Sequence, residues 1–187
     1  MANNKCIKSR SKYSFVNFMT DIITQLHKNG QHKTWQHYRA TLNSFMRFRQ
    51  NKDLSLRKMD AAMIEAYEAY LKQQDVCRNT SSFYMRILRA VYNRAVEQEL
   101  IAQQYPFRRV YTGIDKTRKR AIPFETVKLI KQLDLQQSPS SDMAKDAFMM
   151  SFYLRGISFI DLAHLKKSDL QDGYLHYNRS KTHQRIT

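Results

Sequence analysis

Four segments in the first half of the chain repeat apolar residues every three or four positions, and this spacing limits the fold most strongly. It places apolar side chains on one helix face, whereas a strand would need alternation. Gly30 predicts the end of the first helix, and Thr34, Asp60 and Thr80 are candidate N-caps of the other three. Connections are short and no strand signal intervenes, so we expect a four-helix domain over residues 13–103. The apolar positions are Phe15, Phe18, Met19, Ile22, Ile23 and Leu26; Trp35, Tyr38, Leu42 and Phe45; Met63, Ile64, Tyr67, Tyr70 and Leu71; and Phe83, Ile87, Ala90 and Val91.

Residues 104–122 differ in composition from the segments on either side. They contain a proline, a glycine, few apolar residues and a basic run that includes Arg118, Lys119 and Arg120. Such a stretch is typical of a linker between domains. Residues 1–12 are basic with little apolar content. We therefore predict a basic tail (1–12), a helical domain (13–103), a basic linker (104–122) and a second domain (123–187).

The second domain is predicted to contain two helices and a small β-hairpin. The first helix begins at Phe124, a polar loop follows over residues 136–141, and Ser141 or Asp142 starts the second helix, which leads to Arg155. Asp172-Gly173 predicts a turn, residues 174–179 alternate as in a strand, and a return strand starts at Arg185. The expected fold class is mainly α. The buried side of the second helix is expected to hold Ala144, Ala147, Phe148, Ser151 and Phe152.

The chain is strongly basic. Its 32 Lys and Arg residues against 16 Asp and Glu residues give a formal charge of +16. Such an excess attracts polyanions, so nucleic acid is the first candidate partner and an anionic membrane surface the second. The longest apolar stretch, residues 147–154, is far shorter than the ~20 residues that a membrane-spanning helix needs.

Other classes of protein are disfavoured by composition. The two cysteines, Cys6 and Cys77, form neither a disulfide framework nor a zinc-ligand pattern, so we expect no metal and no cofactor. The N-terminus lacks the apolar region of a signal peptide. We therefore expect a cytoplasmic protein.

Two of the four helices in the first domain carry basic residues on their outward faces. The second shows Arg39 and Arg47, and the fourth shows Arg86, Arg89 and Asn93. The third helix is acidic, with Asp60, Glu65 and Glu68. This asymmetry favours phosphate binding on one side of the bundle. An ordinary solvated face is the alternative.

Arg155 and Lys181 are the candidate reactive cations of the second domain. Arg155 follows an apolar helix and precedes Gly156, so its guanidinium is expected to be partly buried. It could bind a phosphate through two parallel hydrogen bonds. Capping of its own helix is the alternative. Lys181 is expected at the hairpin tip, where it could donate a proton to a leaving oxygen or be inert. Ser158 and Asp161 loosely match a capping box.

The order of these features resembles the tyrosine recombinase (phage integrase) family. The four-helix domain is similar to the SAM-like core-binding domain of that family. Leu154-Arg155-Gly156 resembles the box of the first catalytic arginine, and Asp161, Leu165 and Asp169 keep its acidic, leucine and aspartate spacing. The separation between Arg155 and Asp161 is about three residues longer than usual. Lys181 falls where the family has its hairpin lysine.

The resemblance implies roles for these residues. Arg155 would clamp the scissile phosphate of double-stranded DNA, Lys181 would protonate the departing 5′ oxygen in the same cleft, and Asp161 would support the site from behind. The arginines of the bundle and its Asn93 would face the DNA. The full-length protein would work as a tetramer on two DNA sites.

Two later elements of the family, a His-x-x-Arg box and the nucleophilic tyrosine, are expected beyond Thr187. The spacing His176-Tyr-Asn-Arg179 matches that box, but it precedes Lys181 and lies on a predicted strand, so we interpret it as chance. We expect a fragment that binds DNA without cleaving it. A non-catalytic DNA-binding module and a helical regulator are the alternatives.

Overall fold

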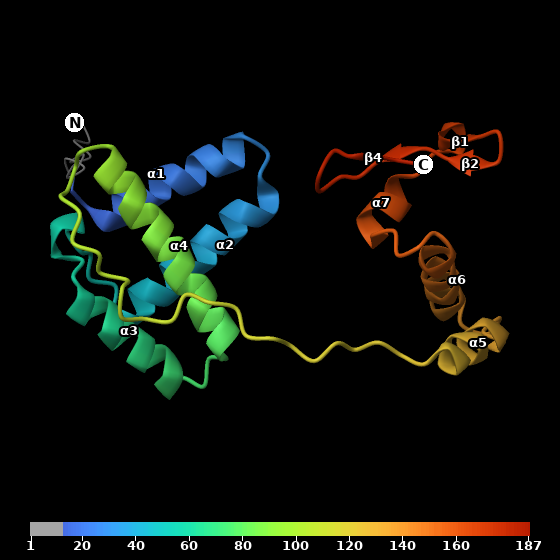
Figure 1. Cartoon of the computed structure of the whole chain (residues 1–187), viewed down its shortest axis with the longest axis horizontal. Coiled ribbons are helices and arrows are strands. Elements are labelled where there is room, and N and C mark those ends of the chain that lie inside the picture. Colours follow the sequence, from blue (N-terminus) through green and yellow to red (C-terminus); the bar gives the residue numbers. More distant parts are fainter. Residues whose placement is uncertain (1–12) are drawn as a thin grey trace, which may run out of the picture. The chain divides into compact units, whose positions relative to one another are not determined.

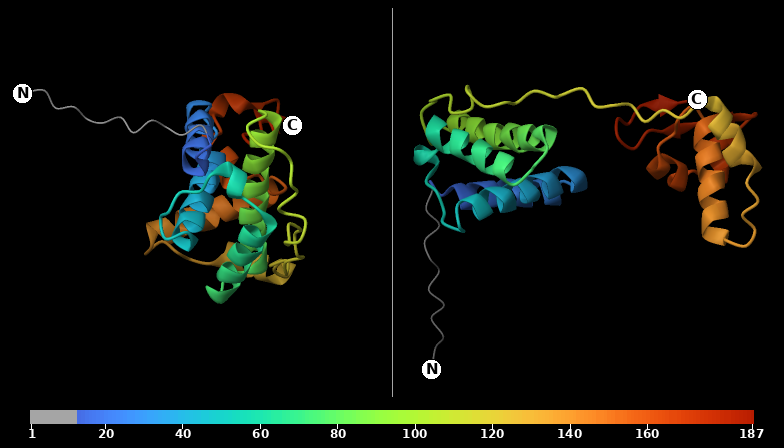
Figure 2. Two further views of the ribbon diagram at one scale, coloured as in Figure 1. Left: turned by 90° about the vertical axis from the view of Figure 1, so that its left-hand side faces the viewer. Right: turned by 90° about the horizontal axis from the view of Figure 1, so that it is seen from below.

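The computed structural model describes residues 13–187, and the predicted basic tail lies outside them. The chain forms two compact units, one reaching Thr117 and the other spanning Arg118–Thr187. The first unit contains α1 (Phe15–Lys28), α2 (His32–Phe48), the 3-10 helix η1 (Leu56–Lys58), α3 (Ala61–Gln73) and α4 (Arg78–Glu97). Helix α1 lies against α2, and α4 lies against α2 and α3 (Figures 1 and 2). The four predicted helices of this unit are confirmed.

The helix starts agree only in part with the predicted N-caps. Asp60 caps α3, since its Oδ1 accepts the Met63 N–H at 2.8 Å. The N-caps predicted at Thr34 and Thr80 are wrong, because α2 begins at His32 and α4 at Arg78. Gly30, at φ 70°, lets the chain turn directly from α1 into α2. Helix α2 therefore begins before Thr34.

Aromatic side chains fill the centre of the first unit. Phe15, Phe45 and Tyr67 are fully buried, and the Phe45 ring lies 5.2 Å from Phe15 and 5.1 Å from Tyr67 in edge-to-face contacts. The Tyr67 hydroxyl donates to the Ser44 hydroxyl at 2.8 Å, so this polar group is satisfied within the core. Burial raises the pKa of Tyr67 far above its ordinary value.

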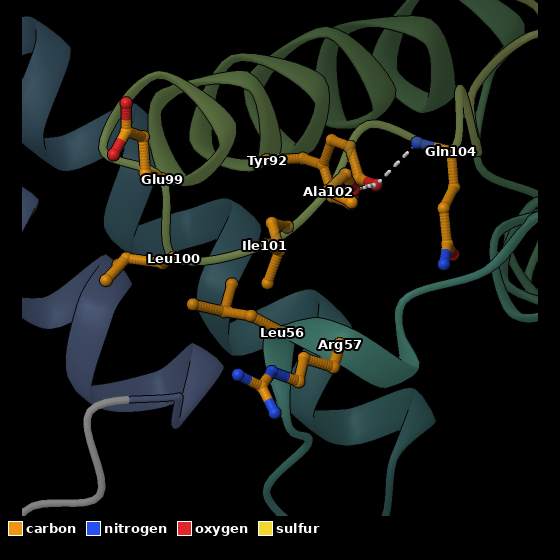
Figure 3. Close-up of a pocket in the computed structure, with 8 residues that line it drawn as sticks. All are labelled: Leu56, Arg57, Tyr92, Glu99, Leu100, Ile101, Ala102 and Gln104. Carbon is orange, nitrogen blue, oxygen red and sulfur yellow. Dashed lines mark hydrogen bonds between the residues drawn. The ribbon is translucent and has the colours of Figure 1, made fainter.

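The chain after α4 stays on the bundle. Tyr92 of α4 donates its hydroxyl to the Ala102 carbonyl at 3.2 Å and accepts the Gln104 N–H at 3.1 Å (Figure 3). Phe107 and Val110 are buried in the same core. The predicted linker of residues 104–122 therefore differs from the structure, since the first compact unit continues to Thr117.

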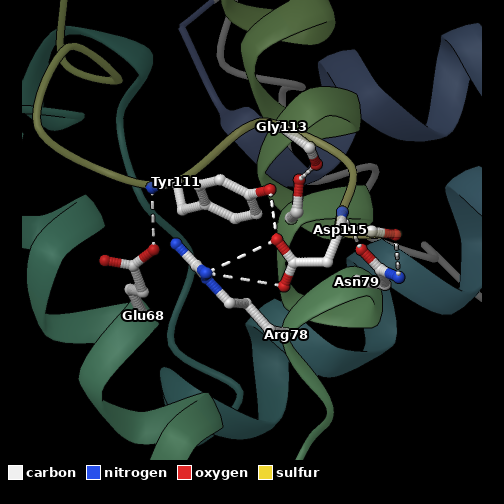
Figure 4. Close-up of polar contacts among 7 residues, drawn as sticks. Glu68, Arg78, Asn79, Tyr111, Gly113 and Asp115 are labelled. Carbon is white, nitrogen blue, oxygen red and sulfur yellow. Dashed lines mark hydrogen bonds and ion pairs between the residues drawn. The ribbon is translucent and has the colours of Figure 1, made fainter. Parts of the chain in front are cut away.

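A segment that we call the strap, residues 110–115, is held against α3 and α4 by polar contacts (Figure 4). Glu68 accepts the Tyr111 N–H at 2.9 Å, and the Asn79 side chain exchanges two hydrogen bonds with the Asp115 backbone at 2.8 and 3.2 Å. The guanidinium of Arg78 stacks 3.8 Å from the Tyr111 ring and pairs with Asp115 at 3.4 Å. Each end of the strap is therefore fixed to a helix.

The second unit contains α5 (Phe124–Gln132), α6 (Pro139–Tyr153), α7 (Phe159–His164), the 3-10 helix η2 (Lys167–Asp169) and four short strands. Strand β1 (Leu170–Gln171) pairs antiparallel with β2 (Tyr174–Leu175), and β3 (Tyr177–Asn178) pairs with β4 (Arg185–Ile186). Asp172 and Gly173 have φ 51° and 80° in the predicted turn. The mainly α fold class is confirmed.

Helix α6 differs from its prediction in start and in burial. It begins at Pro139, which suits the first helical position because its missing N–H needs no partner there. Of its apolar residues only Met149 is buried, while Phe148 and Phe152 are 39% and 42% exposed. Helices α5 and α7 pack against α6 but leave most of its apolar side accessible. No helix in residues 13–187 is long and apolar enough to cross a membrane.

Replacement of Tyr92 by Phe tests how the chain after α4 is attached. We expect Tyr92→Phe to lower the free energy of unfolding of the first unit by about 1 kcal/mol, because two backbone groups lose their hydroxyl partner. Trp35, the single tryptophan, lies in this unit, so urea unfolding followed by tryptophan fluorescence measures the change. Tyr105→Phe is the control, since Tyr105 is 70% exposed. Equal stability of the two variants would contradict the role of Tyr92.

Candidate nucleic-acid interface and phosphate cavity

Three of the predicted DNA-binding residues share one face of α4. Arg86, Arg89 and Asn93 are spaced three and four positions apart, which aligns them on a helix surface. Arg89 donates to the Thr112 hydroxyl of the strap at 3.1 Å. Arg86 is half-buried, with its guanidinium 5.8 Å from the Phe83 ring and its Nε without a partner among the described residues. Asn93 is exposed beside Arg89, and both line a cavity of about 270 Å³.

The two predicted arginines of α2 are exposed. The Arg39 guanidinium lies 5.9 Å from the Trp35 ring. Neither Arg39 nor Arg47 forms an ion pair within residues 13–187. An exposed guanidinium without an acidic partner gives up no internal ion pair when it binds a phosphate.

Two acidic residues of α3 bind other parts of the chain and are not merely solvated. Glu65 pairs with Arg109 at 3.6 Å, and Glu68 accepts the Tyr111 N–H. These carboxylates attach the segment around the strap to the bundle. The sequence alone did not predict this attachment, because no periodic pattern marks it.

Arg118, Lys119 and Arg120 lie in extended chain between the strap and α5. All three are exposed and belong to no helix or strand. None forms an ion pair in the part of the chain that the structure describes. Their charges are therefore available to a polyanion.

Arg155 lies at a sharp corner between α6 and α7. Its φ is 56° and that of Gly156 is 85°, so two consecutive residues are left-handed. The Gly156 N–H donates to the Ser151 carbonyl at 2.8 Å, and the Ser151 hydroxyl donates to the Ile157 carbonyl at 2.8 Å. These bonds fix the corner. The prediction of a partly buried guanidinium was wrong, since Arg155 is exposed and its side chain makes no hydrogen bond within residues 13–187.

Asp161 joins α7 to the turn between β3 and β4. Its side chain is buried, accepts the Ser180 N–H at 2.8 Å and accepts the Ser158 hydroxyl at 2.7 Å. The Asp161 N–H donates to Ser158 Oγ at 3.2 Å, so the N-cap half of the predicted capping box is present. The carboxylate accepts the Ser158 hydroxyl and the Ser180 N–H, and not the Ser158 N–H that a full capping box would use. Hydrogen bonds from Ser180, then from Ser158, and the charge of Arg179 hold the pKa of Asp161 below its ordinary value.

A cavity of about 560 Å³ lies between the Arg155 corner and the paired strands. Arg155, Ser158, Tyr174 and Arg179 are among its lining residues. Lys181, predicted to share a cleft with Arg155, is not among them and lies exposed in the turn. Arg179 instead lines this cavity with Arg155.

The comparisons with known proteins concern the first unit. The family model for the phage integrase SAM-like domain matches residues 14–110, which is more than half of the chain. This chain belongs to the phage integrase family. No curated protein and no solved structure is significantly similar to it. The matched range covers the bundle of this integrase-family chain, while Arg155, Asp161 and Lys181 lie outside it.

Removal of the Asp161 carboxylate tests its hold on the hairpin turn. We expect Asp161→Ala to make the Ser180 amide exchange hydrogen several-fold faster, because that N–H loses its acceptor. Hydrogen exchange by mass spectrometry on the peptide around Ser180 measures this, with Asp146→Ala as the control on exposed α6 surface.

The same hydrogen bond should depend on pH. The folded pKa of Asp161 is lowered, so its stabilisation is present above the ordinary value of 3.8 and is lost as the pH falls through the lowered value. The assignment would be contradicted if the protection of the Ser180 amide from hydrogen exchange changed neither with pH nor on the Asp161→Ala substitution.

Proposed function

We propose that this chain binds double-stranded DNA as part of a site-specific recombinase of the tyrosine type. The observation that carries the proposal is an integrase SAM-like bundle with exposed arginines on two helices, in a chain of net charge +16. Arg39 and Arg47 on α2 and the α4 face of Arg86, Arg89 and Asn93 would contact the phosphate backbone. Arg118, Lys119 and Arg120 would follow the same backbone.

The complete recombinase would exchange strands through a covalent DNA–protein bond. A tyrosine Oη would attack the scissile phosphorus, forming an O–P bond as the bond to the 5′ oxygen breaks. Arg155 would stabilise the added negative charge on the phosphoryl oxygens, and Lys181 would protonate the departing 5′ oxygen. Asp161 would act indirectly, through the turn that carries Lys181. The energy of the broken bond would be kept in the 3′-phosphotyrosyl link, and a tetramer would act on two DNA sites in the cytoplasm.

Substitution of the α2 arginines tests DNA binding by the first unit. We expect Arg39→Ala with Arg47→Ala to weaken binding of a fluorescein-labelled duplex and to lower the slope of log K against log salt. The slope should fall by about 0.9 for each DNA phosphate that the variant no longer neutralises. Fluorescence anisotropy over a salt series measures both quantities.

The matched control removes two charges near α3. Lys72→Ala with Arg109→Ala changes the net charge equally, but Arg109 is paired with Glu65 and Lys72 lies in the last turn of α3. Equal reductions of the slope in the two double variants would show a non-specific charge effect and would count against the proposed face.

A nicked suicide substrate tests the catalytic part of the proposal. None of the 11 tyrosines lies in the sequence context that the family resemblance assigns to the nucleophile, so we expect the 187-residue chain to bind such DNA without forming an adduct. Denaturing electrophoresis of labelled DNA after incubation is the measurement. A covalent adduct that survives denaturation would overturn the expected inactivity and would identify a nucleophile within these residues.

A further inference from the structure

We propose that Arg179 is a second phosphate-binding residue, which together with Arg155 holds the DNA backbone in the cavity between the α6–α7 corner and the β3–β4 strands. This inference rests on the proposed function and adds Arg179 to it. We interpret the spacing of Arg179 from His176 as a chance match to the His-x-x-Arg box. Three observations support it: the cavity, the way the backbone holds Arg179, and the charges that surround this residue.

The cavity is built from segments that are distant along the chain. Residues 153–158 form one wall and residues 173–175 another, while Tyr177, Arg179, Ile186 and Thr187 come from the paired strands and their flanks. Its volume of about 560 Å³ leaves ample room for a phosphodiester group. Arg155 and Arg179 therefore line one space, although they are 24 positions apart in sequence.

The backbone of Arg179 is fixed on both sides. Its N–H donates to the Gln184 carbonyl at 2.9 Å, and its carbonyl accepts the His183 N–H at 2.7 Å. The next N–H, that of Ser180, donates to the buried carboxylate of Asp161. This ordered backbone limits the space that the Arg179 side chain can reach, so less backbone entropy is lost when the side chain binds an anion. By contrast, Lys181 makes no hydrogen bond within residues 13–187.

Neither Arg179 nor Arg155 has an ion-pair partner within residues 13–187. Its charge contributes to the lowered pKa of Asp161, so the two groups are near each other. Asp161 nevertheless forms no ion pair with Arg179 in residues 13–187, since its oxygens accept from Ser180 and Ser158. Arg155 has no acidic partner in that range either. Two arginines that line one cavity make its potential positive, and a phosphate bound there can accept paired N–H donors from each.

The neighbouring histidine has a different environment. His176 Nδ1 lies 3.0 Å from the Thr187 hydroxyl, and the ring lines a separate cavity with Ser168 and Arg185. His176 and Arg179 therefore line different cavities, and their matching spacing stays interpreted as chance. Of the two residues, it is the arginine that reaches the cavity of Arg155.

Single substitutions in the full chain test the inference. We expect Arg155→Ala and Arg179→Ala each to raise the Kd for a mixed-sequence fluorescein-labelled duplex about 3- to 10-fold near 0.1 M salt and to lower the salt slope by about 0.9. Arg179→Lys should keep the slope and lose part of the affinity, because lysine keeps the charge without the two-pronged geometry.

Arg185→Ala is the matched control. Arg185 belongs to the same pair of strands, is exposed and lines the other cavity. Unchanged hydrogen exchange at Ser180 in every variant shows that the hairpin remains folded, so that a loss of binding is not a loss of structure.

The outcomes separate this inference from the function on which it rests. If Arg179→Ala binds DNA as Arg185→Ala does, while the α2 variant is impaired, Arg179 is not a phosphate ligand and DNA binding by the bundle stands. If the unmodified chain does not bind the duplex even at low salt, the proposed function fails and the inference with it. Matched losses of affinity in Arg155→Ala and Arg179→Ala alone support the shared cavity.

Discussion

A few carboxylates join segments of this chain that are distant in sequence. There are half as many acidic residues as basic ones, and several of the acidic residues make contacts between distant segments. Asp53 accepts the Ser14 hydroxyl and the Val16 N–H at the start of α1, Glu68 binds the strap, and Asp161 binds the hairpin turn. These three carboxylates accept backbone or hydroxyl hydrogens and form no ion pair with an arginine in residues 13–187. The same arrangement therefore joins the fold and leaves positive charge at its surface.

A carboxylate also fixes the strap at the point where the chain leaves the first unit. Asp115 is bound by Arg78, Asn79 and the Tyr111 hydroxyl, the last at 2.6 Å, so the chain is fixed to α4 up to the residue before Lys116. The basic run that follows starts from a defined point on the bundle. Hydrogen bonds of the first unit therefore fix the point where the basic run begins, but they do not determine the path that the run takes.

Local patterns predicted the helices of the first unit, but contacts over long sequence separations were beyond them. Apolar periodicity is a property of one helix, and Asp60 caps its helix through residues three positions apart. The strap contacts join residues 31 to 43 positions apart through one or two hydrogen bonds each, and such contacts leave no periodic pattern in the sequence. Burial on α6 was predicted wrongly for a related reason. A periodic face shows which side chains could be covered, but not whether another element covers them.

The candidate phosphate cavity shows how backbone order and side-chain freedom can be combined. The left-handed corner at Arg155 and Gly156 costs free energy that the Ser151 hydrogen bonds offset, and the turn after Arg179 is closed by two backbone bonds. Both guanidiniums thus project from fixed backbone positions without ion pairs of their own in the described chain. A guanidinium already bound to a carboxylate would have to break that ion pair before it could bind phosphate. An arginine without an ion pair avoids this cost, which supports the proposal that Arg179 is the second phosphate ligand.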